Sequence, residues 1–221
     1  RAPRLESKRM VEIVHGLSDV LELVEGVSDT EGHIGNVYDE AADIQVYGFV
    51  TRRTRNRVRD GMSHSAKIER WVMQNESACG LGATVEAQNQ DWLRVGVLVA
   101  VRPREDAAWR VGVVRRLARS GSESFSVGIE IIGDTAHTIV LADGAASGYT
   151  VAGEGHRSVA RQHEALLLNQ CNGNKSLVFD PIVYQPEHVW RTQLPSGPQR
   201  LRLAQPIQLG EGWMEVAFQS L

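Results

Sequence analysis

The chain has 221 residues, of which 42% are hydrophobic and 23% are charged, fractions typical of a soluble globular protein and not of a disordered one. Its 24 Lys and Arg residues against 27 Asp and Glu residues leave a net charge of −3, which argues against a protein that coats duplex nucleic acid. No run approaches the roughly 20 apolar residues that span a bilayer. The 2 cysteines form no CxxC pair, which fits a reducing compartment and supplies no zinc or disulfide framework.

Most of the chain predicts β-strands. The apolar runs are short, rich in Val, Ile, Leu and Trp, and separated by Gly, Asn, Asp or Pro. In chain order the expected strands are 10–17, 69–74, 82–87, 95–101, 109–117, 126–132, 138–142, 149–152, 165–168, 176–179, 189–193, 200–205 and 213–219. Many short strands at spacings of roughly ten residues favour barrels or sandwiches over a parallel sheet. The expected fold class is therefore all-β.

The clearest helix signal covers residues 18–25. Ser18 stands at a capping position, and Val20, Leu21 and Val24 share one face of the helix. A glycine follows at once, so the predicted helix is short.

The charge distribution is strongly polarised between this helix and the next strand. Residues 18–50 contain many acidic side chains but neither Lys nor Arg, whereas residues 51–60, TRRTRNRVRD, are rich in arginine. Because this region has little strand pattern, we interpret residues 18–66 as an insertion between two strands. A solvated arginine run beside an acidic one would need no function.

Motifs of several enzyme classes are absent from the sequence. It has no GxSxG elbow, no HExxH, no GxxxxGKS/T loop and no GxGxxG after a strand. Cys79 lies beside Gly80 with neither His nor Cys near it in sequence, so we expect a small buried thiol and not a nucleophile. We therefore expect a protein that is not an enzyme, with no catalytic residue, no metal site and no cofactor.

The segment WVMQNESACGLG, at 71–82, is the most informative part of the chain. A strand runs here into Asn75, Ser77 and Gly80. Asn and Ser at turn positions either bond the local backbone or reach a ligand. Gly80 and Gly82 permit a close backbone approach or a positive φ, and Gly80 is expected to let the turn pass without a Cβ clash. An ordinary hairpin turn is the alternative interpretation.

This segment and three later ones stand in the order and spacing of the motifs of the PilZ family. They are Asn75, Ser77 and Gly80 as D/N-x-S-x-x-G, RVGVLVAV at 94–101, WRVGVVRRL at 109–117 and VGIEII at 127–132. The chain thus resembles a PilZ domain, which implies a six-stranded antiparallel β-barrel that binds the bacterial second messenger cyclic di-GMP through the motif residues. Asn75 replaces the commoner Asp, and its neutral amide is a weaker acceptor for guanine N–H groups, which lowers the expected affinity.

The resemblance also implies an RxxxR pair that precedes the barrel and folds over the ligand. Ahead of the motif two pairs have this spacing: Arg53 with Arg57, and Arg55 with Arg59. Arg53 and Arg57 are our first choice. Arg4 and Arg9 are one residue too far apart but lie just before the first expected strand, and they are our second choice. Arginine suits this role because its parallel donors match guanine O6 and N7 or two phosphate oxygens, and its plane stacks on a purine.

Residues 149–221 carry no ligand signature. Two long hairpins with alternating apolar residues are expected there, in LLLNQCNGNKSLVFDPIVYQPEHVWRTQL and RLRLAQPIQLGEGWMEVAFQ. They predict a second, smaller β-barrel, and companion β domains, some of them degenerate PilZ-like barrels, occur in PilZ proteins. The predicted domains are 1–135, with an insertion at about 18–66, and 136–221.

The function expected from this combination is that of a bacterial, cytoplasmic cyclic di-GMP receptor. A mobile arginine loop would close on the dinucleotide and change the surface shown to a protein partner or to the adjoining domain. One alternative is a degenerate PilZ module that binds no nucleotide and acts as a protein-interaction scaffold. Another is a small RNA-binding barrel that uses the arginine run, which the overall charge argues against.

Overall fold

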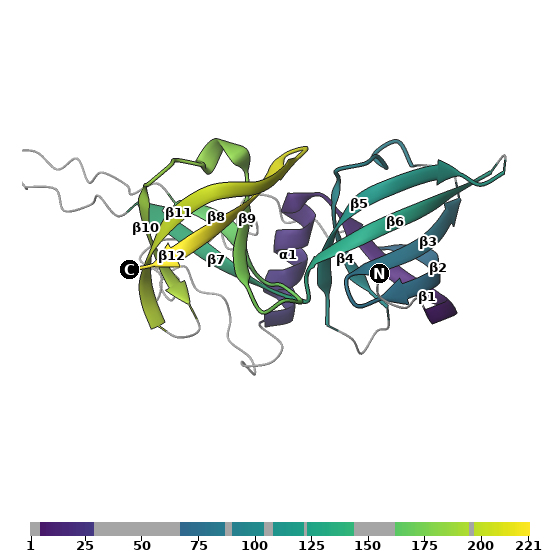
Figure 1. Cartoon of the computed structure of the whole chain (residues 1–221), viewed down its shortest axis with the longest axis horizontal. Coiled ribbons are helices and arrows are strands. Elements are labelled where there is room, and N and C mark those ends of the chain that lie inside the picture. The colour runs from purple at the N-terminus through teal and green to yellow at the C-terminus, as the bar shows by residue number, and fades with distance from the viewer. Residues whose placement is uncertain are drawn as a thin grey trace, which may run out of the picture.

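The first half of the chain forms a closed β-barrel. The structure is a computed structural model that describes residues 5–28, 67–86, 90–103, 108–121, 123–143, 162–194 and 197–221. The first six strands are β1 (Leu5–His15), β2 (Glu69–Ser77), β3 (Gly80–Glu86), β4 (Leu98–Arg102), β5 (Arg110–Arg119) and β6 (Ser124–Gly133). They pair antiparallel in the closed order β1-β2-β3-β6-β5-β4 (Figure 1). β1 therefore completes the barrel between β2 and β4.

The second half forms another closed barrel with the same topology. Its strands are β7 (Thr135–Asp143), β8 (Gln162–Asn169), β9 (Lys175–Phe179), β10 (Val189–Leu194), β11 (Gly197–Gly210) and β12 (Trp213–Ser220), with a 3₁₀ turn, η1 (Pro181–Val183), after β9. Their closed order is β7-β8-β9-β12-β11-β10, so β7 holds the place of β1, β8 that of β2, and so on around the barrel. The all-β prediction with two barrels is confirmed. The topological repeat is not visible in the sequence, since the two halves share no obvious motif.

Each barrel has its own interior core, built from alternating strand residues. In the first barrel Trp71, Met73 and Leu81 point inward among valines and isoleucines. In the second, Phe179 and Trp190 are fully buried among leucines and valines. Alternation along the strands leaves every second side chain on the outside of the barrel. The outer faces therefore decide what the barrels can bind.

A helix and a third apolar cluster join the two barrels. α1 (Leu17–Ser28) lies between them in Figure 1, and its Val20, Leu21 and Val24 are buried there, as their predicted common face requires. Trp213 of the second barrel enters this cluster and donates from Nε1 to the carbonyl of Gly96 in the first barrel at 2.9 Å. The barrels consequently share a buried apolar contact.

The predicted helix is found, and it begins directly after β1. Gly16 makes the connection with a φ of +83°, a conformation in which a side chain would be strained. The expected strand at 149–152 and most of the predicted insertion lie outside the described residues. No helix in the described part of the chain is long and apolar enough to cross a membrane.

Candidate functional site

The motif residues form the hairpin that joins β2 to β3. Ser77 and Gly80 pair across a turn of two residues, and the Ser77 hydroxyl donates to the Gly80 carbonyl at 3.2 Å. Gly80 has no positive φ, and a Cβ there would meet its neighbours only at 3.4 Å, an ordinary contact. The expectation that the turn itself needs glycine at Gly80 is therefore wrong.

A β-bulge turns Asn75 to the outside of the barrel. Met73 pairs with Ala83, both buried inward, but Asn75 pairs with Gly82 and not with Leu81, because the register shifts between Met73 and Asn75. The bulge reverses the alternation of the strand. The Asn75 side chain then lies over Gly82, where an added Cβ would be 2.8 Å from Oδ1 and 2.9 Å from Nδ2.

A second bulge turns Arg116 of β5 to the outside of the barrel. Val114 pairs with the buried Ile129, and after a register shift Arg116 pairs with Gly128 on β6. The Arg116 Cβ would be 3.1 Å from a Cβ placed on Gly128, so its side chain leaves the strand directly above that glycine. Arg116 was not predicted as a site residue, because no sequence signal marks the bulge that exposes it.

These bulges create a flat strip on the outer face of the barrel. Gly82 and Gly128 are direct neighbours in register on β3 and β6. We call these two residues the glycine platform; Asn75 flanks it on one side and Arg116 on the other. Within the described part of the chain neither flanking side chain makes a hydrogen bond or an ion pair. A strip without Cβ atoms accepts a planar ring, and the free amide and guanidinium can bond its edges and an attached phosphate.

Behind the motif, Arg110 connects the turn to the junction of the barrels. Its guanidinium contacts the Glu76 carboxylate at 2.8 Å, the Ala78 carbonyl at 2.9 Å and the Asp134 carboxylate at 3.3 Å. Asp134 in turn donates from its backbone N–H to the Asn169 carbonyl at the end of β8, at 2.8 Å. Arg110 therefore links the motif turn to Asp134, the residue between β6 and β7.

Cys79, in the motif turn, is exposed and not the buried thiol expected from the sequence. Its Sγ lies 2.6 Å from Sγ of Cys171, in the turn between β8 and β9. The neighbouring thiol raises the pKa of Cys79, with a smaller contribution from burial. Among the described residues, no group of three or more His, Cys, Asp or Glu is placed to hold a metal ion.

The structure describes only one of the arginines proposed as the clamp. Arg9 is exposed on β1, opposite Met73, whereas Arg4, Arg53 and Arg57 lie outside the described residues. β1 begins beside the motif, since Leu5 pairs with Glu76. The next residue, Glu6, pairs with Asn75 of the motif itself.

The corresponding face of the second barrel is closed. β8 and β9 hold the places of β2 and β3, and their outward residues are Leu166, Leu168 and Val178. All three are buried in the apolar cluster between the barrels. Nothing on this face resembles the glycine platform, so of the two equivalent faces only that of the first barrel is open to a ligand.

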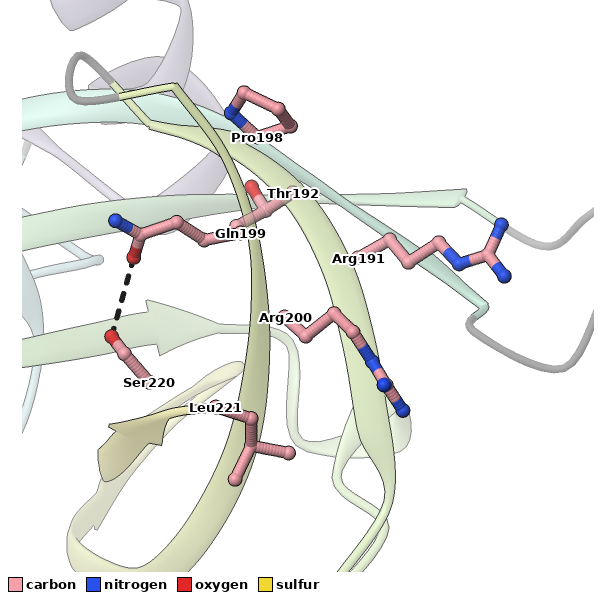
Figure 2. A pocket seen from close by; sticks show the side chains of 7 residues that line it. All are labelled: Arg191, Thr192, Pro198, Gln199, Arg200, Ser220 and Leu221. Atoms are coloured by element: carbon pink, nitrogen blue, oxygen red, sulfur yellow. Dashed lines mark hydrogen bonds between the residues drawn. The ribbon is translucent and has the colours of Figure 1, made fainter.

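A separate pocket of about 460 Å³ lies on the second barrel. Figure 2 shows Arg191 and Arg200 at its wall, from the neighbouring strands β10 and β11, with Ser220 donating to Gln199 at 3.2 Å. In Figure 1, β10 and the C-terminus lie at the opposite end of the molecule from β2 and β3. The pocket therefore contains none of the residues predicted for the ligand site.

A comparison with protein families matches this barrel. Residues 35–138, a little under half of the chain, match the model described as "Cyclic-di-GMP receptor FimW, middle PilZ domain". The match includes β2 to β6 and the whole glycine platform, and it begins after β1 and α1. No curated protein and no solved structure matches the chain. Residues 35–138 thus match a PilZ domain, and the strand order and hairpin motif of the first barrel agree with that match.

Proposed function

We propose that the first barrel binds cyclic di-GMP on the outer face of β2, β3, β6 and β5. The observation that carries the proposal is the glycine platform with its two unpaired polar flanks, in a barrel that matches a cyclic di-GMP receptor family. A guanine would lie over the platform, with the Asn75 amide turned aside from Gly82 to the guanine edge. Purine rings need such a surface because any Cβ would hold them away from the backbone.

Each flanking residue has a role in this pose. Arg116 supplies the positive charge for a phosphate and parallel donors for guanine O6 and N7. Asn75 accepts from, or donates to, the guanine edge across Gly82. Ser77 and Gly80 border the same face at the open end of the hairpin, and the Ser77 hydroxyl keeps acceptor capacity while it donates to Gly80.

The arginine clamp is the second half of the proposed site. The family match begins at residue 35 and so includes Arg53 and Arg57, which supports them as first choice. The pairing of Leu5 with Glu76 supports Arg4 and Arg9 as second choice, because it brings the start of β1 to the motif. Whichever pair acts, it closes on a dianion, and loss of a bidentate contact costs roughly 1–3 kcal/mol.

Binding is proposed to reach the second barrel through Arg110. The same guanidinium holds Glu76 in the motif and Asp134 at the junction, so a shift of the turn changes the contact between the barrels. In this proposal the barrels are two domains, 1–135 and 136–221, of a non-enzymatic bacterial cytoplasmic receptor. The closed face of the second barrel, which packs against the first, fits a domain that responds to this altered contact. The second barrel would then present a changed surface to a protein partner.

Isothermal titration with cyclic di-GMP tests the site. Arg116→Ala should weaken binding by roughly 1–3 kcal/mol, about fivefold to a hundredfold, without lowering the melting temperature. Arg191→Ala is the matched control, because Arg191 is an exposed arginine on β10 of the second barrel, away from the proposed site. A wild-type affinity for Arg116→Ala would contradict the platform.

Double alanine variants decide between the arginine pairs. Arg53 and Arg57 are replaced together in one variant, and Arg4 and Arg9 in the other. Only one double variant should lose binding. If both bind normally, neither pair is the clamp.

The alternative function is a scaffold that binds no nucleotide. The Asn at position 75 in place of the family's commoner Asp is the observation that favours it, because a neutral amide binds the guanine edge less strongly. Absence of any heat of binding with folded protein would support the scaffold. Salt-dependent binding of random single-stranded RNA would instead support an RNA-binding barrel.

A further inference from the structure

The two cysteines of the chain come together from topologically equivalent turns. Cys79 is in the turn between β2 and β3, and Cys171 is in the turn between β8 and β9, 92 residues later. Their sulfur atoms are 2.6 Å apart, close to the roughly 2.05 Å of a disulfide bond. Both are exposed, and they are the only cysteines among the 221 residues. Small oxidants can therefore reach the pair.

Both turns are held in place by hydrogen bonds. The Cys79 carbonyl accepts from the Ile131 backbone N–H at 3.1 Å, which fastens the first turn to β6. In the second turn Gly173 donates to the Gln170 carbonyl at 2.9 Å. The short sulfur distance is thus set by two anchored turns, so bond formation requires little backbone movement.

We propose that Cys79 and Cys171 form a reversible disulfide that fastens the motif turn of the first barrel to the second barrel. With a low-molecular-weight disulfide as oxidant, one thiolate attacks it, forms a mixed disulfide and releases one thiol. The thiolate of the second cysteine then attacks this mixed disulfide, displaces the remaining half of the oxidant as a second thiol and forms the Cys79–Cys171 bond. The protein loses two electrons and two protons, and the oxidant is reduced to two thiols. In a reducing compartment such a bond would be transient and would report the redox state.

The bond would act on the motif because of where Cys79 stands. It lies two residues after Ser77 and directly before Gly80, in the turn whose ends border the platform face. The proposed function requires this turn to shift when the ligand binds, and a bond that fixes the turn opposes that shift. Affinity for cyclic di-GMP should therefore fall by about fivefold or more in the oxidised protein. Only this effect rests on the proposed function.

The bond itself is tested without nucleotide. The purified chain is incubated with oxidised glutathione and digested under non-reducing conditions, and mass spectrometry should find the Cys79 and Cys171 peptides joined in a monomer. The melting temperature should rise by roughly 10 °C, because the bond closes a long loop of the unfolded chain. Cys79→Ser and Cys171→Ser are the controls, and each should form only a glutathione adduct with no such rise. Glutathione adducts or intermolecular dimers in the wild type would overturn the proposal.

Titration with cyclic di-GMP then compares the oxidised and reduced proteins. A weaker oxidised form, with no difference in Cys171→Ser, supports control of the motif turn. Equal affinities in a cross-linked protein that binds the nucleotide overturn that control but leave the proposed site intact. Absence of binding in both forms refutes the proposed function. The peptide map then still decides, independently, whether the cross-link forms.

Discussion

Replacing Gly82 by Ala tests the platform with the smallest possible change. The added Cβ would lie 2.8 Å from Asn75 Oδ1 and 2.9 Å from Nδ2, distances that real Cβ atoms essentially never show. The Asn75 amide is the end of a flexible side chain, so it rotates away and the strand pairing survives. The methyl group thus removes Asn75 from its place over the platform and also raises the surface on which the guanine would lie.

The expected loss of affinity follows from the bonds that Asn75 can make. One or two neutral hydrogen bonds contribute about 0.5–1.5 kcal/mol each, so binding should weaken by about 0.5–3 kcal/mol, or twofold to a hundredfold. Folding should not suffer, because Ala in a strand is favoured over Gly by roughly 0.5–1 kcal/mol. The melting temperature should therefore stay level or rise by a few degrees.

Calorimetric titration of a double-mutant cycle separates the two effects of the methyl group. In an Asn75→Ala background there is no amide to displace, so Gly82→Ala should cost less there than in the wild type. Equal costs in both backgrounds would mean that the methyl group meets the ligand directly and that Asn75 is not the intermediary. Wild-type affinity for Gly82→Ala in the original background would refute the platform altogether.

Three further outcomes test the fold and its ionisable groups. Trp213→Ala should lower the free energy of unfolding by roughly 3–5 kcal/mol in chemical denaturation. The substitution leaves a cavity in the apolar cluster between the barrels and removes the hydrogen bond to the Gly96 carbonyl. A change under about 1 kcal/mol would show that the barrels do not depend on this contact. Burial lowers the pKa of His15, which stacks on Trp92 at 3.9 Å, below its ordinary value of about 6.5 in the unfolded chain. The contribution of His15 to the free energy of unfolding should therefore be constant above about pH 6.5 and decrease as the pH falls below that value. An NMR titration that places the pKa of His15 at or above the ordinary value would contradict this. Because the adjacent thiol raises the pKa of Cys79, Cys171→Ser should speed alkylation of Cys79 at mildly alkaline pH. Peptide mass spectrometry can measure the rate, and an unchanged rate would show that the two thiols are apart in solution.

Local patterns predicted the elements well, because strands and the helix depend on nearby residues. Alternating apolar residues located both barrels, and Val20, Leu21 and Val24 located α1, although the helix begins at Leu17 and Ser18 is not its cap. The motif also placed Asn75, Ser77 and Gly80 on one hairpin, as the structure has them. These features depend only on the spacing of apolar residues along the chain and on the residue types that form a turn.

The parts of the site that the sequence did not predict depend on register. Arg116 faces outward because of a shift beside Arg115, and no residue type marks that shift. The same holds for the pairing of Gly82 with Gly128, which belong to strands far apart along the chain. Likewise, Cys79 looked like an isolated buried thiol because its neighbour arrives from the other barrel.

The two barrels share a topology but use the same outer face in opposite ways. In the first barrel glycines and polar residues keep the face of β2 and β3 open, whereas leucines and a valine bury the corresponding face of β8 and β9 against α1 and the first barrel. A buried apolar face cannot admit a charged dinucleotide, since removing its phosphates from water would not be offset there. The arrangement therefore divides the work. In the proposed function one copy of the fold keeps this face for the ligand, whereas the other buries the equivalent face against the first barrel. Arg110, which contacts Asp134, and Cys79, which lies beside Cys171, are further links between the motif and the second barrel.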